Sequence, residues 1–260
     1  MYCEDFYISR VGIVRTSRGT MQVKERPILM TKENVQAILD GKKTQTRRVI
    51  KPQPVYDYSH IEVGFYHPTK IDRHGEEYPG AKIFGAYTLD GEWGCKCPYG
   101  QVGDRLYIKE AHYRYGYWGL VEGKTKTGKE IWRFSGLVDL FGGCFKYLEN
   151  PPSDVLPYSS TQLGWYKRSP LFMPKKFARY WLEITGIRVE RVQDITHEDA
   201  IAEGAEYMPN AEPREQRLSV PRIVFAGYWD SINAKRGYSW ESNPWVWVIE
   251  FKVVSNATTD

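Results

Sequence analysis

The chain has 260 residues, of which 42% are hydrophobic and 26% are charged, and these are ordinary proportions for a folded protein. They exclude a disordered chain and a collagen-like chain. No stretch approaches the roughly 18 consecutive apolar residues of a membrane-spanning helix, and residues 1–10 lack the apolar segment of a signal peptide. We therefore expect a cytoplasmic protein that does not contact a membrane.

The net charge of +4 is modest but unevenly distributed. Residues 1–60 contain 11 Lys and Arg against 6 Asp and Glu, a local net charge of +5, and aromatic residues make up 15% of the whole chain. Cations suit phosphates and flat rings suit bases, so this composition favours binding of RNA, DNA or a modified nucleoside. A solvated basic surface around a ring-filled core would have the same composition, so both interpretations stay open.

The four cysteines (Cys3, Cys95, Cys97 and Cys144) are too few for a disulfide framework in a chain of this length. Cys95 and Cys97 form a C-x-C pair, whereas zinc sites usually combine C-x2-C with a second pair of ligands. No second pair is present, and the five histidines are scattered. We expect no bound metal and no cofactor.

The first predicted elements lead to a basic segment. Residues 26–30 (RPILM) predict a buried core strand, and Thr31 can cap a following helix whose apolar positions are Val35, Ile38 and Leu39. Gly41 is expected to end that helix in a left-handed conformation. The basic segment 41–51 (GKKTQTRRVIK) follows directly. If it is extended, side chains 43, 45 and 47 point one way and 44, 46 and 48 the other.

The middle of the chain predicts less regular structure. Residues 52–100 are rich in Tyr, Pro and Gly and indicate an insertion with hairpins. Residues 101–104 form a turn signal, and residues 105–113 alternate as a strand. Residues 114–170 are aromatic and Gly-rich without a clear period. The loop aromatics are candidates for base stacking: Tyr99, Tyr113, Tyr115, Tyr117 and Trp118.

Regular elements resume at residue 179. Residues 179–195 predict two strands joined at Gly186, and Thr196 can cap a short helix. Pro221 opens another helix with apolar positions Phe225, Trp229 and Ile232, and residues 245–254 (WVWVIEFKVV) predict a central strand. Many short strands with few short helices indicate a mainly β, α+β fold of the small-barrel type. We expect a peripheral segment at 1–25 and one domain at 26–254, with insertions at about 52–97 and 114–170.

Gly41, Lys43 and Arg48 fit the G-x-K-x-x-x-x-R core of ASCH domains, which belong to the PUA-like superfamily. Four further segments agree in order: the Gly103-Asp104 turn with its strand, ITGIRVERVQDI, THEDAIAEG and VIEFKVV. The layout resembles the larger ASCH proteins carried by phages and prophages. The resemblance implies a PUA-like β-barrel with long aromatic-rich insertions. It also implies RNA or modified-base binding in a cleft, in a host cytoplasm if the chain is phage-encoded.

The active positions resemble one small ASCH group that hydrolyses the amide of N4-acetylcytidine. That group has Lys, Thr and Arg two, five and seven residues after the glycine, which here are Lys43, Thr46 and Arg48, and its catalytic Glu matches Glu203. A threonine hydroxyl becomes a nucleophile when a base such as a low-pKa lysine accepts its proton, and a carboxylic acid can protonate the departing amine. The same residues can instead hold a phosphate or a base edge, with Glu203 paired to Lys43.

Four functional hypotheses remain. The first is a nucleic-acid or modified-nucleotide binding module, with ligand contacts from Lys42, Arg47, Arg48, Lys51, Tyr99 and Tyr113 beside Lys43, Thr46 and Glu203. The second is an amidohydrolase that acts on an acylated base and uses Lys43, Thr46 and Glu203 as catalytic residues. Weaker alternatives are a ribonuclease, although no histidine pair is evident to act as acid and base, and a phage protein that binds a host factor.

Overall fold

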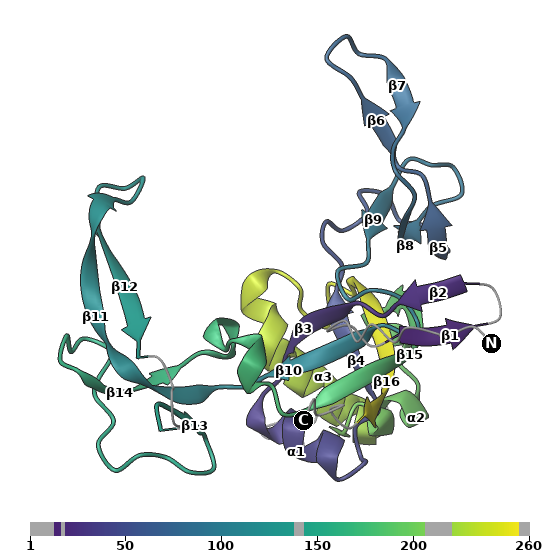
Figure 1. The fold of residues 1–260 in the computed structure, drawn as a ribbon. Coiled ribbons are helices and arrows are strands. Elements are labelled where there is room, and N and C mark those ends of the chain that lie inside the picture. The colour runs from purple at the N-terminus through teal and green to yellow at the C-terminus, as the bar shows by residue number, and fades with distance from the viewer. Residues whose placement is uncertain (1–12, 17–18, 138–142, 206–219, 255–260) are drawn as a thin grey trace, which may run out of the picture. The chain divides into compact units, whose positions relative to one another are not determined.

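The computed structural model describes residues 13–16, 19–137, 143–205 and 220–254, with backbone alone before residue 23. The chain is mainly β with short helices, an α+β composition (Figure 1). The strands are β1 (Ile13–Thr16), β2 (Gly19–Gln22), β3 (Glu25–Leu29), β4 (Gln45–Val49), β5 (Glu62–Tyr66), β6 (Thr69–Ile71), β7 (Glu77–Pro79), β8 (Ile83–Tyr87), β9 (Gly94–Lys96), β10 (Arg105–Lys109), β11 (His112–Lys124), β12 (Glu130–Gly136), β13 (Phe145–Tyr147), β14 (Gly164–Arg168), β15 (Trp181–Arg191) and β16 (Trp245–Val254). The α-helices are α1 (Lys32–Leu39), α2 (His197–Ala202) and α3 (Val220–Asn233). Residues 1–12 of the segment expected to be peripheral lie outside the described residues.

The largest sheet has five strands in the order β3-β10-β15-β16-β4. β16 lies between β15 and β4, which confirms the prediction of a central strand at 245–254. β3 is a strand as predicted, but it lies at the end of the order, and Leu29 is 41% exposed. The sheet is open in the described residues, so the closed barrel expected from the sequence is not found there.

The chain folds as two compact units, and each is described by itself. The described parts of the first unit are residues 13–27, 36–107 and 180–254. The second unit consists of residues 28–35 and the described parts of 108–179, so it contains the insertion predicted at 114–170.

The core of the first unit forms where α2 and α3 pack against the sheet. Phe225 and Trp229 of α3 pack with Val246 and Val248 of β16, and all four are buried. Ile232 was expected on the same face of α3, but it is 36% exposed and lies outside this cluster. The helix is therefore anchored by its middle turns.

The predicted helix boundaries are confirmed where short-range capping sets them. Thr31 Oγ1 accepts a hydrogen bond from the Asn34 backbone N–H at 3.3 Å, and Thr196 Oγ1 accepts one from Asp199 at 3.1 Å. Gly41 has a φ of +69°, in the left-handed region that favours glycine.

The strand predictions were less accurate at two places. Residues 181–191 form one strand and not two, because Gly186 keeps its place in the ladder opposite Glu250 and only a bulge interrupts the register. Residues 114–170 are more regular than expected, since β11 and β12 form a long antiparallel hairpin. Cross-strand aromatic pairs support this hairpin, such as Trp118 opposite Phe134 with ring centroids 5.4 Å apart.

The insertion predicted at about 52–97 does contain hairpins. β5, β8 and β9 form a three-stranded antiparallel sheet, and β6 pairs with β7. Tyr66 and Tyr87 stack within this sheet, with ring centroids 5.0 Å apart.

Candidate functional site

The basic segment passes from the end of α1 into β4, and its side chains alternate as expected. β4 pairs with β16 from Gln45 to Val49. Gln45 Nε2 donates to the Asp199 carbonyl oxygen at 2.8 Å, and Arg47 Nη2 donates to the Asp199 carboxylate at 2.7 Å. These two side chains therefore share the strand face that meets α2.

Lys43 and Glu203 form the centre of the candidate site. The two residues are joined by an isolated antiparallel bridge, and the neighbouring Thr44 N–H donates to the Ala202 carbonyl oxygen at 2.8 Å. Lys43 Nζ donates to Glu203 Oε2 at 2.6 Å and to the Glu203 carbonyl oxygen at 2.8 Å. The side chains are only 2% and 3% exposed. The structure thus brings together two predicted site residues that lie 160 positions apart.

Close packing at Gly204 holds this contact in place. Gly204 has a φ of +79°, and a Cβ atom there would lie 3.3 Å from the Cβ atoms of both Ala37 and Lys43. A larger residue at this position would be strained in backbone conformation and tightly packed against Lys43. The glycine after α2 therefore allows the Glu203 backbone to approach Lys43.

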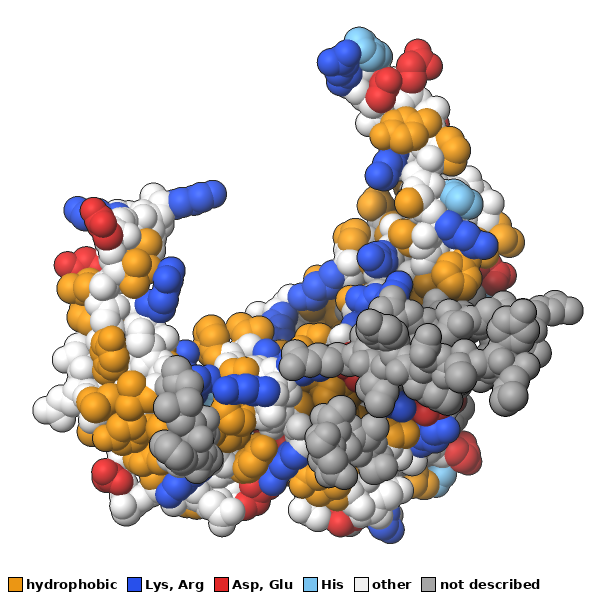
Figure 2. Space-filling view, viewed as in Figure 1, with side chains coloured by type: hydrophobic (Ala, Val, Ile, Leu, Met, Phe, Trp, Pro, Cys, Tyr) orange, Lys and Arg blue, Asp and Glu red, His pale blue; other side chains and the backbone are white. Residues whose placement is uncertain are grey.

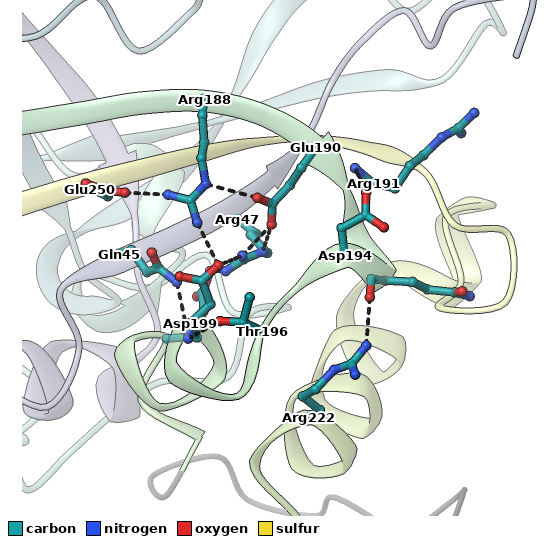
Figure 3. Close-up of polar contacts among 12 residues, drawn as sticks. Gln45, Arg47, Arg188, Glu190, Arg191, Asp194, Thr196, Asp199, Arg222 and Glu250 are labelled. Carbon is teal, nitrogen blue, oxygen red and sulfur yellow. Dashed lines mark hydrogen bonds and ion pairs between the residues drawn. The ribbon is translucent and has the colours of Figure 1, made fainter. Parts of the chain in front are cut away.

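Arg47 extends the site into a buried network of charges (Figure 3). Its guanidinium group, 0% exposed, contacts the carboxylates of Glu190, Asp199 and Glu203. The Nη1 atom lies 3.2 Å from Glu203 Oε1, so Glu203 bridges Lys43 and Arg47 with its two oxygens. Lys43, Arg47 and Glu203 each have a partner of opposite charge, and this offsets the cost of burying their charges.

Arg188 closes the network on its more exposed side. It donates to Glu190 Oε2 at 2.9 Å and to Asp199 Oδ2 at 2.7 Å, and it also contacts Glu250 (Figure 3). Three cations and four carboxylates therefore meet here: Lys43, Arg47 and Arg188 with Glu190, Asp199, Glu203 and Glu250. The network has no surplus positive charge with which to hold a phosphate.

The environment shifts the pKa values of three groups in this network: those of Lys43 and Asp199 are lowered, and, against the effect of burial, that of Arg188 is raised by Glu190 and Asp199. Burial lowers the pKa of Lys43, and the charges of Arg48 and Arg47 add to that effect, while Glu203 opposes it. Burial alone would raise the pKa of Asp199, but hydrogen bonds and charge from Arg47, with the charge of Arg188, bring it below its ordinary value. A buried lysine with a lowered pKa gives up its proton more readily than a solvated one.

Thr46 is placed differently from the other two predicted catalytic residues. It is buried on β4 between Gln45 and Arg47, so its side chain points to the opposite face of the strand from theirs. Lys43 Nζ makes its hydrogen bonds to Glu203, and none to Thr46 is found among the described residues. Lys43 and Glu203 are in contact, whereas Thr46 lies outside that contact.

The remaining predicted ligand residues have different surroundings. Lys42 and Lys51 are exposed, and the Lys51 ammonium group lies 5.0 Å from the centroid of the Tyr238 ring. Burial raises the pKa of Tyr99, and the charge of Arg48 opposes that rise, which places Tyr99 near Arg48. Tyr113 lies on β11 in the second unit and so does not belong to the unit that holds Lys43.

Sequence reasoning predicted Glu203 but missed the other carboxylates of the network. Glu190 and Asp199 were not singled out, although each carboxylate contacts both Arg47 and Arg188. One signal was available, because Arg188 and Glu190 are two residues apart and so share one face of a strand. Asp199 lies in α2, so its contact with Arg47 and Arg188 depends on how that helix packs against the sheet. The sequence pattern does not indicate this packing.

Within the described parts of the chain, no three His, Cys, Asp or Glu side chains are grouped closely enough to hold a metal ion. The Cys95 Sγ donates to the Lys51 carbonyl oxygen at 3.2 Å, and burial raises the pKa of Cys97 to about 11. Burial also raises the pKa of Cys95, so both thiols are mainly protonated at neutral pH. Among the described helices, none has the length and apolar character needed to cross a membrane.

Comparisons with family models, with curated proteins and with solved structures find no match to this chain.

Proposed function

We propose that this chain is an ASCH-type protein of the PUA-like superfamily that binds a modified nucleotide or base, free or within a nucleic acid, beside Lys43 and Glu203. The observation that carries the proposal is the buried contact between these two side chains. Groups with perturbed pKa values cluster at functional sites, and the pKa of Lys43 is lowered by burial. The order of the glycine, lysine and arginine in the basic segment supports the family assignment.

The charges suggest a division of roles. A base edge presents both donors and acceptors, which Lys43 and Glu203 can match as donor and acceptor. The inner network is already neutralised, so phosphates are contacted by exposed lysines outside it, such as Lys51. Because Lys43 and Glu203 are almost completely covered, neighbouring side chains must move when the ligand enters.

Binding can be tested with a panel of labelled single-stranded RNA, single-stranded DNA and nucleosides. We expect Lys43→Ala to weaken binding at least tenfold at every salt concentration, because it removes a contact with the base. Lys51→Ala should instead reduce the slope of log affinity against log salt by about one unit, because it removes a phosphate contact. Fluorescence anisotropy at several salt concentrations measures both effects.

Lys70→Ala is the matched control, since it removes an exposed lysine from β6. It should leave both affinity and salt slope unchanged. Glu203→Gln keeps the shape of the pair and should also weaken binding. Absence of binding to every member of the panel at low salt, or equal losses for Lys70→Ala and Lys43→Ala, would contradict the proposal.

A second candidate function is hydrolysis of an N-acylated base, and the lowered pKa of Lys43 favours it. In this reaction Lys43 accepts the proton of the Thr46 hydroxyl, the threonine oxygen attacks the amide carbonyl, and Glu203 in its acid form protonates the departing amine. Water then hydrolyses the acyl-threonine ester. Because the Thr46 side chain points to the opposite face of β4 from Gln45 and Arg47, the step requires this segment to rearrange until Lys43 Nζ and the Thr46 hydroxyl group meet.

Thr46→Val separates hydrolysis from binding. The valine keeps the shape of the buried side chain and removes only the hydroxyl group, so turnover should fall below detection while affinity changes less than twofold. Chromatographic detection of free cytidine from N4-acetylcytidine measures turnover. If the unmodified chain binds the nucleoside without releasing acetate, or if Thr46→Val retains full turnover, this second function is wrong.

A further inference from the structure

The second unit contains an aromatic cavity, distinct from the Lys43 network, to which the function proposed above assigns no role. It measures about 400 Å³, and its lining residues are Trp118, Trp132, Tyr158, Ser159, Ser160 and Thr161. Ligand pockets of this size accept a group as large as a base with its sugar. All six residues belong to the unit that includes residues 108–179.

The register of the β11–β12 hairpin explains why the two tryptophans line one cavity. Trp118 is opposite Phe134 and Leu120 is opposite Trp132, so these four side chains share one face of the hairpin. The loop after residue 157 places the Tyr158 ring 4.6 Å from the Trp118 ring. Trp132 is 45% exposed and Tyr158 is 71% exposed, so both rings are accessible to a ligand.

The loop that carries the hydroxyl groups is held in place by backbone contacts. Tyr166 is 1% exposed, and its hydroxyl group donates to the carbonyl oxygens of Ser160 and Gln162 at 3.0 and 2.7 Å. The Gln162 N–H donates to Ser160 Oγ at 3.2 Å. The cavity wall is therefore preorganised, which lowers the cost of binding.

A cation already lies against the aromatic cluster. The Arg168 guanidinium group lies 4.7 Å from the centroid of the Trp118 ring and 4.3 Å from that of Phe134. A second cation would be repelled, so the cavity does not suit a methylated lysine or another ammonium ligand. It suits an uncharged flat ring. The buried Trp118 Nε1 has no hydrogen-bond acceptor among the described residues and can donate to such a ring.

The charge of the surrounding segment indicates what the ring is attached to. Residues 108–179 contain 12 Lys and Arg against 6 Asp and Glu, a net charge of +6, more than the +4 of the whole chain. The end of the β11–β12 hairpin exposes Lys124, Lys126 and Lys129. Figure 2 shows Lys and Arg side chains beside hydrophobic ones along this hairpin. A ring joined to a polyanion fits this surface better than an aromatic side chain of a protein.

We propose that the cavity is a stacking subsite for one unpaired base of a single-stranded nucleic acid. The base stacks on Trp132 and Tyr158, and the hydroxyl groups of Ser159, Ser160 and Thr161 contact its edge. The lysines of the hairpin lie along the phosphates. This subsite is independent of the function proposed for Lys43, since it lies in the other unit and uses no residue of that network.

The test uses the full chain and a fluorescein-labelled 12-nucleotide single strand, as RNA and as DNA. We expect Trp132→Ala and Tyr158→Ala each to weaken binding at least fivefold, because one stacked base contributes about 1–3 kcal/mol. Trp132→Phe, which keeps a ring, should restore most of the affinity. Tyr78→Ala removes a ring that is 47% exposed on β7 and is the matched control, with no expected effect.

A strand of abasic sugars has the same phosphates and no bases. It should bind the unmodified chain at least fivefold more weakly, and Trp132→Ala should cause no further loss. Equal binding of the abasic strand, or unchanged affinity of both alanine variants, would overturn the proposal. It would also be overturned if an aromatic peptide quenched the tryptophan fluorescence and displaced the labelled strand. Repeating Trp132→Ala in a Lys43→Ala background should give the same fold-loss, so failure at one site is distinguishable from failure at the other.

Discussion

Replacing Arg47 with alanine is expected to lower the free energy of unfolding by about 3–5 kcal/mol, since one partner of a buried charge network is removed. The Arg47 guanidinium group is 0% exposed and contacts three carboxylates. Without it, the carboxylates of Glu190, Asp199 and Glu203 remain close together in a partly dry environment. Their mutual repulsion and their lost hydrogen bonds both act against the folded state.

Chemical denaturation followed by circular dichroism measures this effect. Lys252→Ala is the matched control, because Lys252 also pairs with a carboxylate, Glu183, but its side chain is 60% exposed. The control should lose less than about 1 kcal/mol. Arg47→Lys should be nearly as unstable as Arg47→Ala, because an ammonium group cannot donate to three carboxylates in the planar arrangement of a guanidinium group. Losses for Arg47→Ala no larger than for Lys252→Ala would show that the network contributes little to stability.

The second large effect concerns His112 in the second unit. Burial is the main cause that lowers the pKa of His112 to about 4, from an ordinary value of 6.5. The side chain is 0% exposed and stacks on Phe145, with ring centroids 4.8 Å apart. Its Nδ1 donates to the Glu110 carbonyl oxygen at 3.1 Å, while its buried Nε2 has no partner among the described residues. A proton added at Nε2 would therefore have no acceptor.

This lowered pKa makes stability depend on pH in a defined direction. Between pH 4 and 6.5 the unfolded chain binds a proton at His112 that the folded chain does not, so stability rises with pH in this range. The contribution is fully present above pH 6.5, and about 3 kcal/mol is lost as the pH falls to 4. The positive charges of Arg114, Arg168 and Lys109 act in the same direction.

His112→Asn removes the titrating group and keeps a donor for the Glu110 carbonyl oxygen. We expect the variant to be less stable at pH 7, but its stability should fall less steeply between pH 6.5 and 4.5 than that of the unmodified chain. His60→Asn, in which an exposed histidine is replaced, should keep the original steepness. Urea denaturation at four pH values, followed by tryptophan fluorescence, measures the slopes. Equal slopes for His112→Asn and the unmodified chain would show that His112 titrates normally.

The accuracy of the sequence predictions depended on how local their physical cause was. The caps at Thr31 and Thr196 and the left-handed Gly41 were predicted correctly, because each depends on a few neighbouring residues. The long hairpin at 112–136 was missed, because Gly and aromatic residues alternate there without a hydrophobic period. It is stabilised by pairing between strands, which no window of the sequence displays.

The sequence by itself determined the central strand at 245–254, since eight of its ten residues are apolar and such a run favours a place between two other strands. It also determined the alternation that places Gln45 and Arg47 on one face of β4. Only the tertiary structure decided which partners these side chains meet. The carboxylates of Glu190, Asp199 and Glu203 reach Arg47 because β15, β4 and the α2 segment converge. A buried cation requires such partners, but their identity depends on packing between segments more than 140 residues apart in the chain.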